Sequence, residues 1–411
     1  MHPATPSAKI EPPTDSKRSK KRTKLIELSS LQMNRQGAAS VNLALIGADA
    51  GMSRNAVYYY FKDRHALTAA CYEESLRYLA EAIESALAVD GSALDRLASF
   101  ISQVLSERGQ FVAVMADLDL TRPEDAKRFE KQNEIIVGKL QSIIEAGIRE
   151  KQFRRVSPAL AARVLMSMLE WKRLWCAFMG HDARALIAGA GDLGRWLENG
   201  ILVDQTFKLR DVPSVHELWE SSVDVMDPAA VNRQRRNHLL GAASSLFNVR
   251  GIHATTIDDI AKTLGCTKGF VYHYVEDKDE LIRMCYDRAF DSYQRFWEAG
   301  QRYGAGTAES MLIQMHLNAQ AQLSKFPPLA IQASLADLPR EYRQRSTAIW
   351  KRTTDNVRLA IEAGVAHSET DKLVDISAGA FFWLGKRCPD DYKQSSTPGD
   401  VVDLFAHGLC L

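Results

Sequence analysis

The sequence has few cysteines, and none of them are arranged in pairs. Its six cysteines are scattered along 411 residues without a C-x-x-C spacing, which excludes the usual zinc motifs and predicts reduced thiols in a cytoplasm. No stretch reaches the roughly 18 uninterrupted apolar residues that a membrane helix needs. The first 24 residues, rich in Pro, Ser and Lys, have no apolar run of the kind a secretory signal contains. We therefore expect a cytoplasmic protein.

Catalytic patterns are also missing. The sequence has no phosphate-cradling glycine loop, no His/Cys cluster with metal-ligand spacing and no G-x-S-x-G elbow, and its ten histidines are dispersed. These absences predict that the chain is not an enzyme and needs no cofactor or metal. An enzyme is thus the weakest of the interpretations that we weighed.

The net charge of +1 hides an uneven distribution. Residues 17–65 hold ten Lys/Arg against three Asp/Glu, whereas residues 233–280 hold seven against six. A nearly neutral chain with one strongly basic end is typical of local phosphate binding, although a solvated basic tail would give the same composition.

An internal repeat dominates the sequence. Residues 51–67 align without a gap on residues 265–281, and Gly51 and Gly265 are 214 residues apart. The same spacing pairs Asn34 with Asn248 and Cys71 with Cys285. Two copies of a long unit indicate a duplicated protein rather than a solenoid.

Strand signals are nearly absent, and long segments repeat apolar residues every three or four positions, which is the helical period. We predict an all-α fold of two tandem units, each with a three-helix domain followed by a helical body. The predicted parts are a disordered basic arm (1–20), two small domains (21–68 and 232–282), two bodies (69–206 and 283–411) and a linker (207–231).

The second small domain shows the clearer helix signals. Gly251 is expected to stop the first helix, and Thr256, with Asp259 three residues on, to cap a second helix over 257–264. Gly265 ends that helix, and Thr267 is expected to cap a third over 268–275. Two short helices joined by a glycine-containing turn form a helix-turn-helix motif.

Side-chain spacing assigns two faces to each third helix. Val271 and Val275 in one copy, and Val57 and Phe61 in the other, lie at the i, i+4 spacing of a core-facing stripe. Arginine, asparagine, lysine and tyrosine then occupy the outer face, as reading a DNA groove requires. The alternative, that the tyrosines only pack between helices, applies most strongly to Tyr60 and Tyr274.

The motif G-x-[S/T]…V-Y-x-Y-[F/V]…D-[R/K]-x-x-L in both halves resembles the DNA-binding domain of the tetracycline-repressor (TetR) family. The specific likeness covers about 45–50 residues per half. It implies a transcriptional regulator, more specifically a repressor, whose partner is an operator in duplex DNA. It also implies that each body binds a small-molecule effector and dimerises.

The resemblance also implies residue roles. Ser53, Thr256 and Thr267 would begin the short helices at the DNA, and Arg64 and Lys278 would bind phosphate at the start of the next helix. The remaining DNA contacts would come from Arg54, Asn55, Tyr58, Tyr59, Tyr60, Lys268, Gly269, Tyr272, His273 and Tyr274. Glu276 would lie near the DNA phosphates, and its negative charge predicts a lower DNA affinity for the second copy.

Because both modules lie on one chain, we expect an intramolecular pseudo-dimer in which helices around 158–178 and 187–203 pack against those around 371–386 and 399–410. Further homodimerisation stays open. The effector would shift the balance between DNA-competent and incompetent states. The predicted pocket lining is Met168, Trp171, Trp175 and Phe178 in the first half, with Met315, Phe382 and Trp383 in the second.

Two other interpretations compete with a regulator. One is a ligand sensor or adaptor that does not bind DNA and whose helix-turn-helix modules are degenerate. The other is an oxidation switch at Cys266, for which the sequence offers no evident resolving cysteine; Cys71 and Cys285 are expected to pack as small apolar groups.

Overall fold

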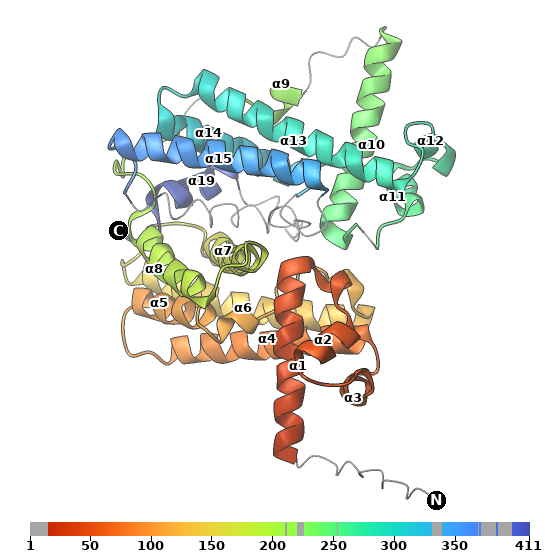
Figure 1. Cartoon of the computed structure of the whole chain (residues 1–411). Helices are drawn as coiled ribbons and strands as arrows, with labels where there is room; N and C mark the ends of the chain where they lie inside the picture. Colours follow the sequence, from red (N-terminus) through yellow and green to blue (C-terminus); the bar gives the residue numbers. More distant parts are fainter. Residues whose placement is uncertain are drawn as a thin grey trace, which may run out of the picture.

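The computed structural model describes residues 15–209, 212–219, 226–252, 254–330, 339–368, 370, 384 and 397–411. All regular elements within these ranges are helices, as predicted (Figure 1). The first half contains α1 (Asp15–Gln36), η1 (Ala38–Ser40), α2 (Leu43–Asp49), α3 (Arg54–Tyr60), α4 (Arg64–Leu87), α5 (Ala93–Val104), η2 (Gly109–Phe111), η3 (Leu118–Leu120), α6 (Pro123–Arg149), α7 (Pro158–Phe178) and α8 (Ala183–Asn199).

The second half begins with an additional short helix and then follows a similar order. It contains α9 (Val215–Trp219), α10 (Pro228–Arg250), α11 (Ile257–Leu264), α12 (Lys268–Tyr272), α13 (Lys278–Tyr303), α14 (Thr307–Leu323), α15 (Arg340–Glu362) and α19 (Pro398–His407). We call α1–α3 and α10–α12 the first and second heads, and the remaining helices of each half its body.

Three element boundaries differ from the sequence-based expectation. The arm predicted to be disordered over 1–20 is helical from Asp15, so its basic stretch forms the first turns of α1. The linker predicted to reach residue 231 ends earlier, at Pro228, where a proline at N1 and the Asp227 cap start α10. The third helix of the second head ends at Tyr272 rather than at residue 275.

The two heads are stabilised by the same packing. Cys71 and Cys285 are fully buried, and their thiols donate to the carbonyls of Ile26 and Leu240, each at 3.6 Å. Burial raises the pKa of both thiols to about 12, so they are small, unreactive core groups, as the sequence predicted. In the first head, Gly47 of α2 allows close contact with α3, since a Cβ there would lie 2.5 Å from Cγ2 of Val57.

A buried asparagine joins each head to its body in the same way. The Asn34 amide donates to the carbonyl of Val112 and accepts from the amide of Val114, both at 2.9 Å. Asn248 donates to the carbonyl of Pro328 at 3.0 Å and accepts from the amide of Ala330 at 2.7 Å. The repeat therefore extends to the hydrogen bonds that orient each head.

Backbone hydrogen bonds between matching segments join the two halves of the chain. Isolated bridges join Phe153 to Cys410 and Leu202 to Ala366, so the segment after α6 meets the C-terminus and the segment after α8 meets the segment after α15. The amides of Leu202 and Leu409 donate across the interface at 3.0 and 2.7 Å, to Ala406 and Leu197 respectively. Such reciprocity is the pattern of a two-fold interface.

Side chains of α7, α8 and α19 fill this interface. The rings of Trp196 and Phe405 are 5.3 Å apart, and the guanidinium of Arg154 binds Asp403 at 3.0 Å and the carbonyl of Gly408 at 2.7 Å. These contacts match the packing predicted for 187–203 against 399–410. The helix predicted around 371–386 lies outside the described residues, apart from buried Leu384.

No helix in the described part of the chain is both long enough and apolar enough to span a bilayer.

Candidate nucleic-acid interface

The short helices of both heads begin at the residues that the sequence predicted as caps. Ser53 accepts from the amide of Ala56 at 3.3 Å, and Thr267 accepts from Phe270 at 3.3 Å. Thr256 and Asp259 form a complete capping box. Each cap fixes the start of a helix, because it satisfies one of the amides that the first helical turn leaves unpaired.

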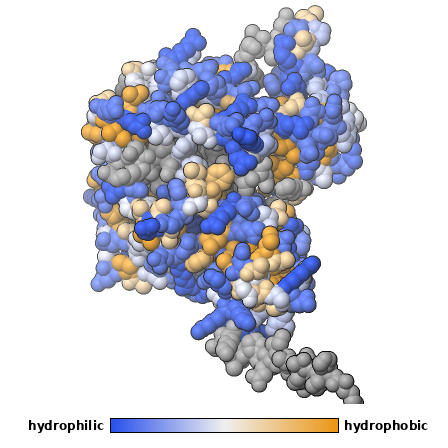
Figure 2. All heavy atoms as spheres, in the orientation of Figure 1, coloured by the Kyte–Doolittle hydropathy of each residue, from blue (hydrophilic) through white to orange (hydrophobic). Residues whose placement is uncertain are grey.

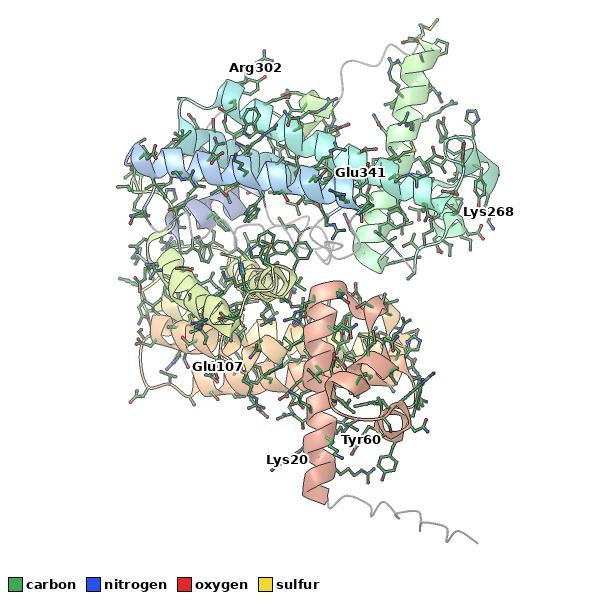
Figure 3. The ribbon with its side chains drawn as sticks, viewed as in Figure 1. Lys20, Tyr60, Glu107, Lys268, Arg302 and Glu341 are labelled. Atoms are coloured by element: carbon green, nitrogen blue, oxygen red, sulfur yellow. The ribbon has the colours of Figure 1, made fainter. Side chains whose placement is uncertain are left out.

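The outer face of α3 carries the predicted DNA-facing residues. Arg54 and Asn55 are exposed, as are Tyr58 and Tyr59, at 44% and 60%. The Arg54 guanidinium lies 5.7 Å from the centre of the Tyr58 ring. Tyr60 differs from its neighbours, since it is half-buried and packs against the core, where Figure 3 shows it beside α1.

The second head presents a similar face with one charge already paired. Gly269, Tyr272 and His273 are exposed, and Lys268 lies at the outer edge of α12 (Figure 3). The Lys268 ammonium binds the carboxylate of Asp258 on α11 at 2.6 Å, and this hydrogen bond raises the pKa of Lys268. Part of the positive charge on α12 is therefore neutralised within the protein.

Three of the predicted contact residues have a partner within the protein or are partly buried. Tyr274 donates to Asn232 of α10 at 2.8 Å, and Arg64 donates to the carbonyl of Ala39 at 2.8 Å. Lys278 is half-buried, and this burial lowers its pKa. The bonds of Tyr274 and Arg64 link segments of the chain that sequence spacing alone did not pair.

Basic side chains of α1 lie beside the end of α3, and α10 carries basic residues at the matching positions. Arg18 of α1 lies 5.0 Å from the ring of Tyr59, and Arg22 lies 5.4 Å from that of Phe61. On α10, Arg235 and Arg236 are exposed. They stand 214 residues after Lys21 and Arg22. The spacing of the repeat could therefore have predicted these basic residues on α10.

Both heads lie on the same side of the molecule, away from the C-terminus (Figure 1). The short helices α3 and α12 lie towards the outer edges of that side. Hydrophilic side chains cover most of the second head and the lower part of α1 on the face in Figure 2.

The predicted pocket residues of the first half form an aromatic row. Met168 and Trp171 are buried, and the Trp175 ring is 6.0 Å from Trp171 and 6.2 Å from Phe178. Trp175 also packs against Trp350 of α15 at 4.8 Å, which extends the row into the second half. Met315 packs against the core, and Phe382 and Trp383 lie outside the described residues.

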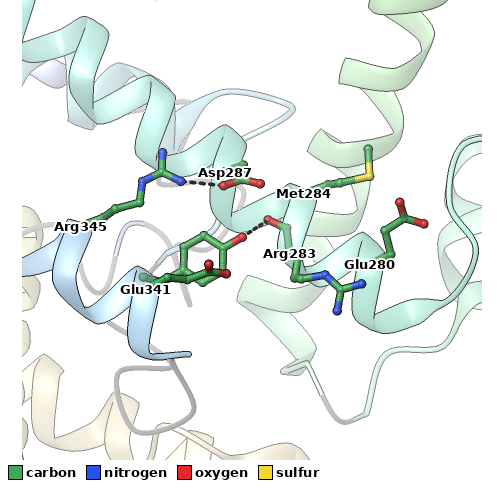
Figure 4. A pocket seen from close by; sticks show the side chains of 7 residues that line it. Glu280, Arg283, Met284, Asp287, Glu341 and Arg345 are labelled. Carbon is green, nitrogen blue, oxygen red and sulfur yellow. Dashed lines mark hydrogen bonds and ion pairs between the residues drawn. The ribbon is translucent and has the colours of Figure 1, made fainter.

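A separate open pocket of about 400 Å³ lies between α13 and α15 (Figure 4). Two interactions join its lining residues: Arg345 binds Asp287 at 2.6 Å, and the Tyr342 hydroxyl donates to the carbonyl of Arg283 at 3.2 Å. Among the described residues, no three His, Cys, Asp or Glu side chains gather as a metal site.

Comparison with known proteins gives the same two modules. The family model described as bacterial regulatory proteins, tetR family, matches residues 26–71 and 239–285. The model described as tetracyclin repressor-like, C-terminal domain, matches residues 90–190.

Curated relatives match over about 70 residues of the chain. The chain is 34% identical over 71 residues to the HTH-type transcriptional regulator HbdR of Aromatoleum sp. (strain CIB), covering 17% of this chain and 31% of that protein. It is 39% identical over 70 residues to the HTH-type transcriptional repressor KstR2 of Rhodococcus jostii (strain RHA1), covering 16% and 34%. The matches thus span about a third of the length of these relatives. A solved structure, the TetR family regulator PfmR from Thermus thermophilus, has a TM-score of 0.35 and 21% identity, covering 42% of this chain and 98% of that one.

Proposed function

Because this chain belongs to the TetR family of bacterial regulatory proteins and carries that family's DNA-binding domain twice, we propose that it binds an operator in duplex DNA through both heads and represses transcription. The observation that carries this proposal is the pair of outward helices, with arginine, asparagine and tyrosine exposed on α3 and lysine and tyrosine on α12. Arginine and asparagine suit base edges, whereas lysine and tyrosine suit phosphates.

The proposal extends to an intramolecular pseudo-dimer. The exchanged bridges of Phe153 with Cys410 and Leu202 with Ala366 support it, since they reproduce a two-fold interface within one chain. Covalent fusion raises the effective concentration of the second head once the first has bound. The two outer faces differ in sequence, so the operator would consist of two unlike half-sites.

Regulation would follow from an effector bound in a body. Asn34 and Asn248 support such coupling, because each ties a head to a loop of its body through two hydrogen bonds. An effector that shifts this loop would move the head and lower its affinity for DNA. Binding of the effector and of DNA would then oppose each other.

The salt dependence of DNA binding tests the proposal. Fluorescence anisotropy with a labelled duplex, measured between 50 and 200 mM salt, should give an association constant that falls by orders of magnitude, on the scale of roughly 10³–10⁵ for 6–10 phosphate contacts. A chain that binds no duplex at low salt would instead be a ligand sensor or adaptor.

A further inference from the structure

A positive charge lies in the interior of the first body. Arg173 of α7 is only 3% exposed. Its Nε and Nη1 atoms are buried and have no hydrogen-bond partner in the part of the chain that the structure describes. Arg163, two to three turns earlier on the same helix, instead binds the carboxylate of Glu134 at 2.9 Å. Arg173 thus has two buried donors that no group in the described part of the chain accepts.

Arg173 stays charged at neutral pH. Burial lowers its pKa to about 10, and Glu170 and Tyr78 act in the opposite direction. A buried guanidinium whose N–H groups are not all hydrogen-bonded is unfavourable in a protein interior. Packing alone does not account for a guanidinium at this position, because an apolar side chain of similar length would fill the same space at no electrostatic cost.

Polar groups next to Tyr78 extend this charged region towards the surface. The Tyr78 hydroxyl donates to the carbonyl of Gln103 at 2.6 Å and lies 3.0 Å from the Ser106 hydroxyl. A second cation, exposed Arg108, lies over the Tyr78 ring at 4.9 Å. Met166 and Leu169, which precede Arg173 on α7 by seven and four residues, are buried and apolar. This combination suits a ligand with an anionic head and an apolar chain.

We propose that Arg173 binds the oxyanion head group, carboxylate or phosphate, of the effector in the first body. This inference rests on the proposed function, since it names the chemistry of the effector that would release DNA. The N–H groups of Arg173 would donate charge-assisted hydrogen bonds to the anion, which is the use for which arginine is better suited than lysine.

The test uses the full chain and two probes, sodium octanoate and inorganic phosphate, each compared with sodium chloride at equal ionic strength. We expect a saturable rise of the melting temperature with at least one probe and at least tenfold weaker binding, by calorimetric titration, in Arg173→Met. The unliganded variant should be as stable as the wild type or more so, because replacing a buried charge with a packed apolar residue removes its desolvation cost.

Two further variants separate binding from folding. Arg184→Met removes an exposed arginine that pairs locally with Asp182, and should leave anion binding unchanged. Arg173→Lys keeps the charge and should retain measurable binding. Octanoate alone, phosphate alone or both acting on the wild type would each support an oxyanion site and identify the head group.

Two results would overturn the inference. One is a wild type that neither probe stabilises beyond chloride, and the other is an Arg173→Met variant that is destabilised but binds both anions as before. Anisotropy on the same samples keeps the two proposals apart. Duplex binding without any anion effect would refute the oxyanion site alone, whereas absence of duplex binding would refute the regulator.

Discussion

Gly200 and Gly408 end the last helix of each half with the same left-handed backbone and lie against one another. Their φ angles are +63° and +68°. A Cβ on Gly200 would be 2.5 Å from the amide nitrogen of Gly408, and a Cβ on Gly408 would be 2.6 Å from that of Gly200. The two halves therefore meet backbone to backbone at this point, without room for a side chain.

This contact predicts that Gly408→Ala destabilises the whole chain. Alanine would adopt an unfavourable φ, at about 1–2 kcal/mol, and its Cβ would also push against the Trp196 carbonyl at 2.5 Å. We expect a total loss of about 3 kcal/mol or more, measured by calorimetry. Gly180→Ala is the matched control, since Gly180 has φ +69° and nothing within 4 Å of an added methyl group. Equal effects of the two variants would show that the halves do not meet tightly here.

The outer face of α3 predicts a loss of DNA affinity without a loss of stability. Arg54→Ala should cost about 1–3 kcal/mol of binding, and Tyr58→Phe should cost less, because it removes only an exposed hydroxyl. Anisotropy and thermal melting of the same samples check this. Arg77→Ala, which removes an exposed arginine paired with Glu74 and Glu81 on α4, should leave affinity unchanged; an equal loss there would point to a general effect of charge.

The Lys268–Asp258 pair predicts a variant that binds DNA more tightly. Asp258→Asn should free the ammonium of Lys268 for a phosphate and steepen the salt dependence by about one unit of slope. We expect a several-fold gain in affinity, again by anisotropy. Glu298→Gln, which neutralises an exposed acid on α13, is the control for net charge. A lower DNA affinity of Asp258→Asn would mean that the ion pair is needed to position α12 for binding.

The asparagine links predict effects confined to one half. Asn34→Leu should leave the Val112 carbonyl and the Val114 amide unpaired in the interior, a cost of about 1–3 kcal/mol for each group. Hydrogen exchange should accelerate at Val114 in Asn34→Leu and at Ala330 in Asn248→Leu. If either variant accelerated both amides equally, the two heads would not be held independently.

Much of the fold was predictable because duplication doubles each local signal. The second helix of the second head, Ile257–Leu264, matches the expected bounds. Its start and its end could be predicted because the sequence shows both the capping residue and the glycine that ends the helix. The start of α1 at Asp15 was not predictable, because a run of lysine and serine has the composition of a disordered tail whether or not it forms a helix.

The site was predictable in its chemistry but not in its pairings. Spacing assigned Tyr58 and Tyr272 to an outer face, as the structure has them. It could not show that Arg64 would bond to Ala39, because this contact joins elements whose relative position depends on the folded chain. Nor could composition show that Arg173 is buried, because lysine and arginine pairs usually lie on exposed helix edges.

Selection of bound duplexes from a random pool tests the central claim most directly. If both heads of one chain grip DNA together, the enriched sequences should contain two unlike half-sites, with centres about one helical turn, 10–10.5 base pairs, or a multiple of it apart. Recovery of a perfect palindrome, or of one isolated half-site, would contradict the account.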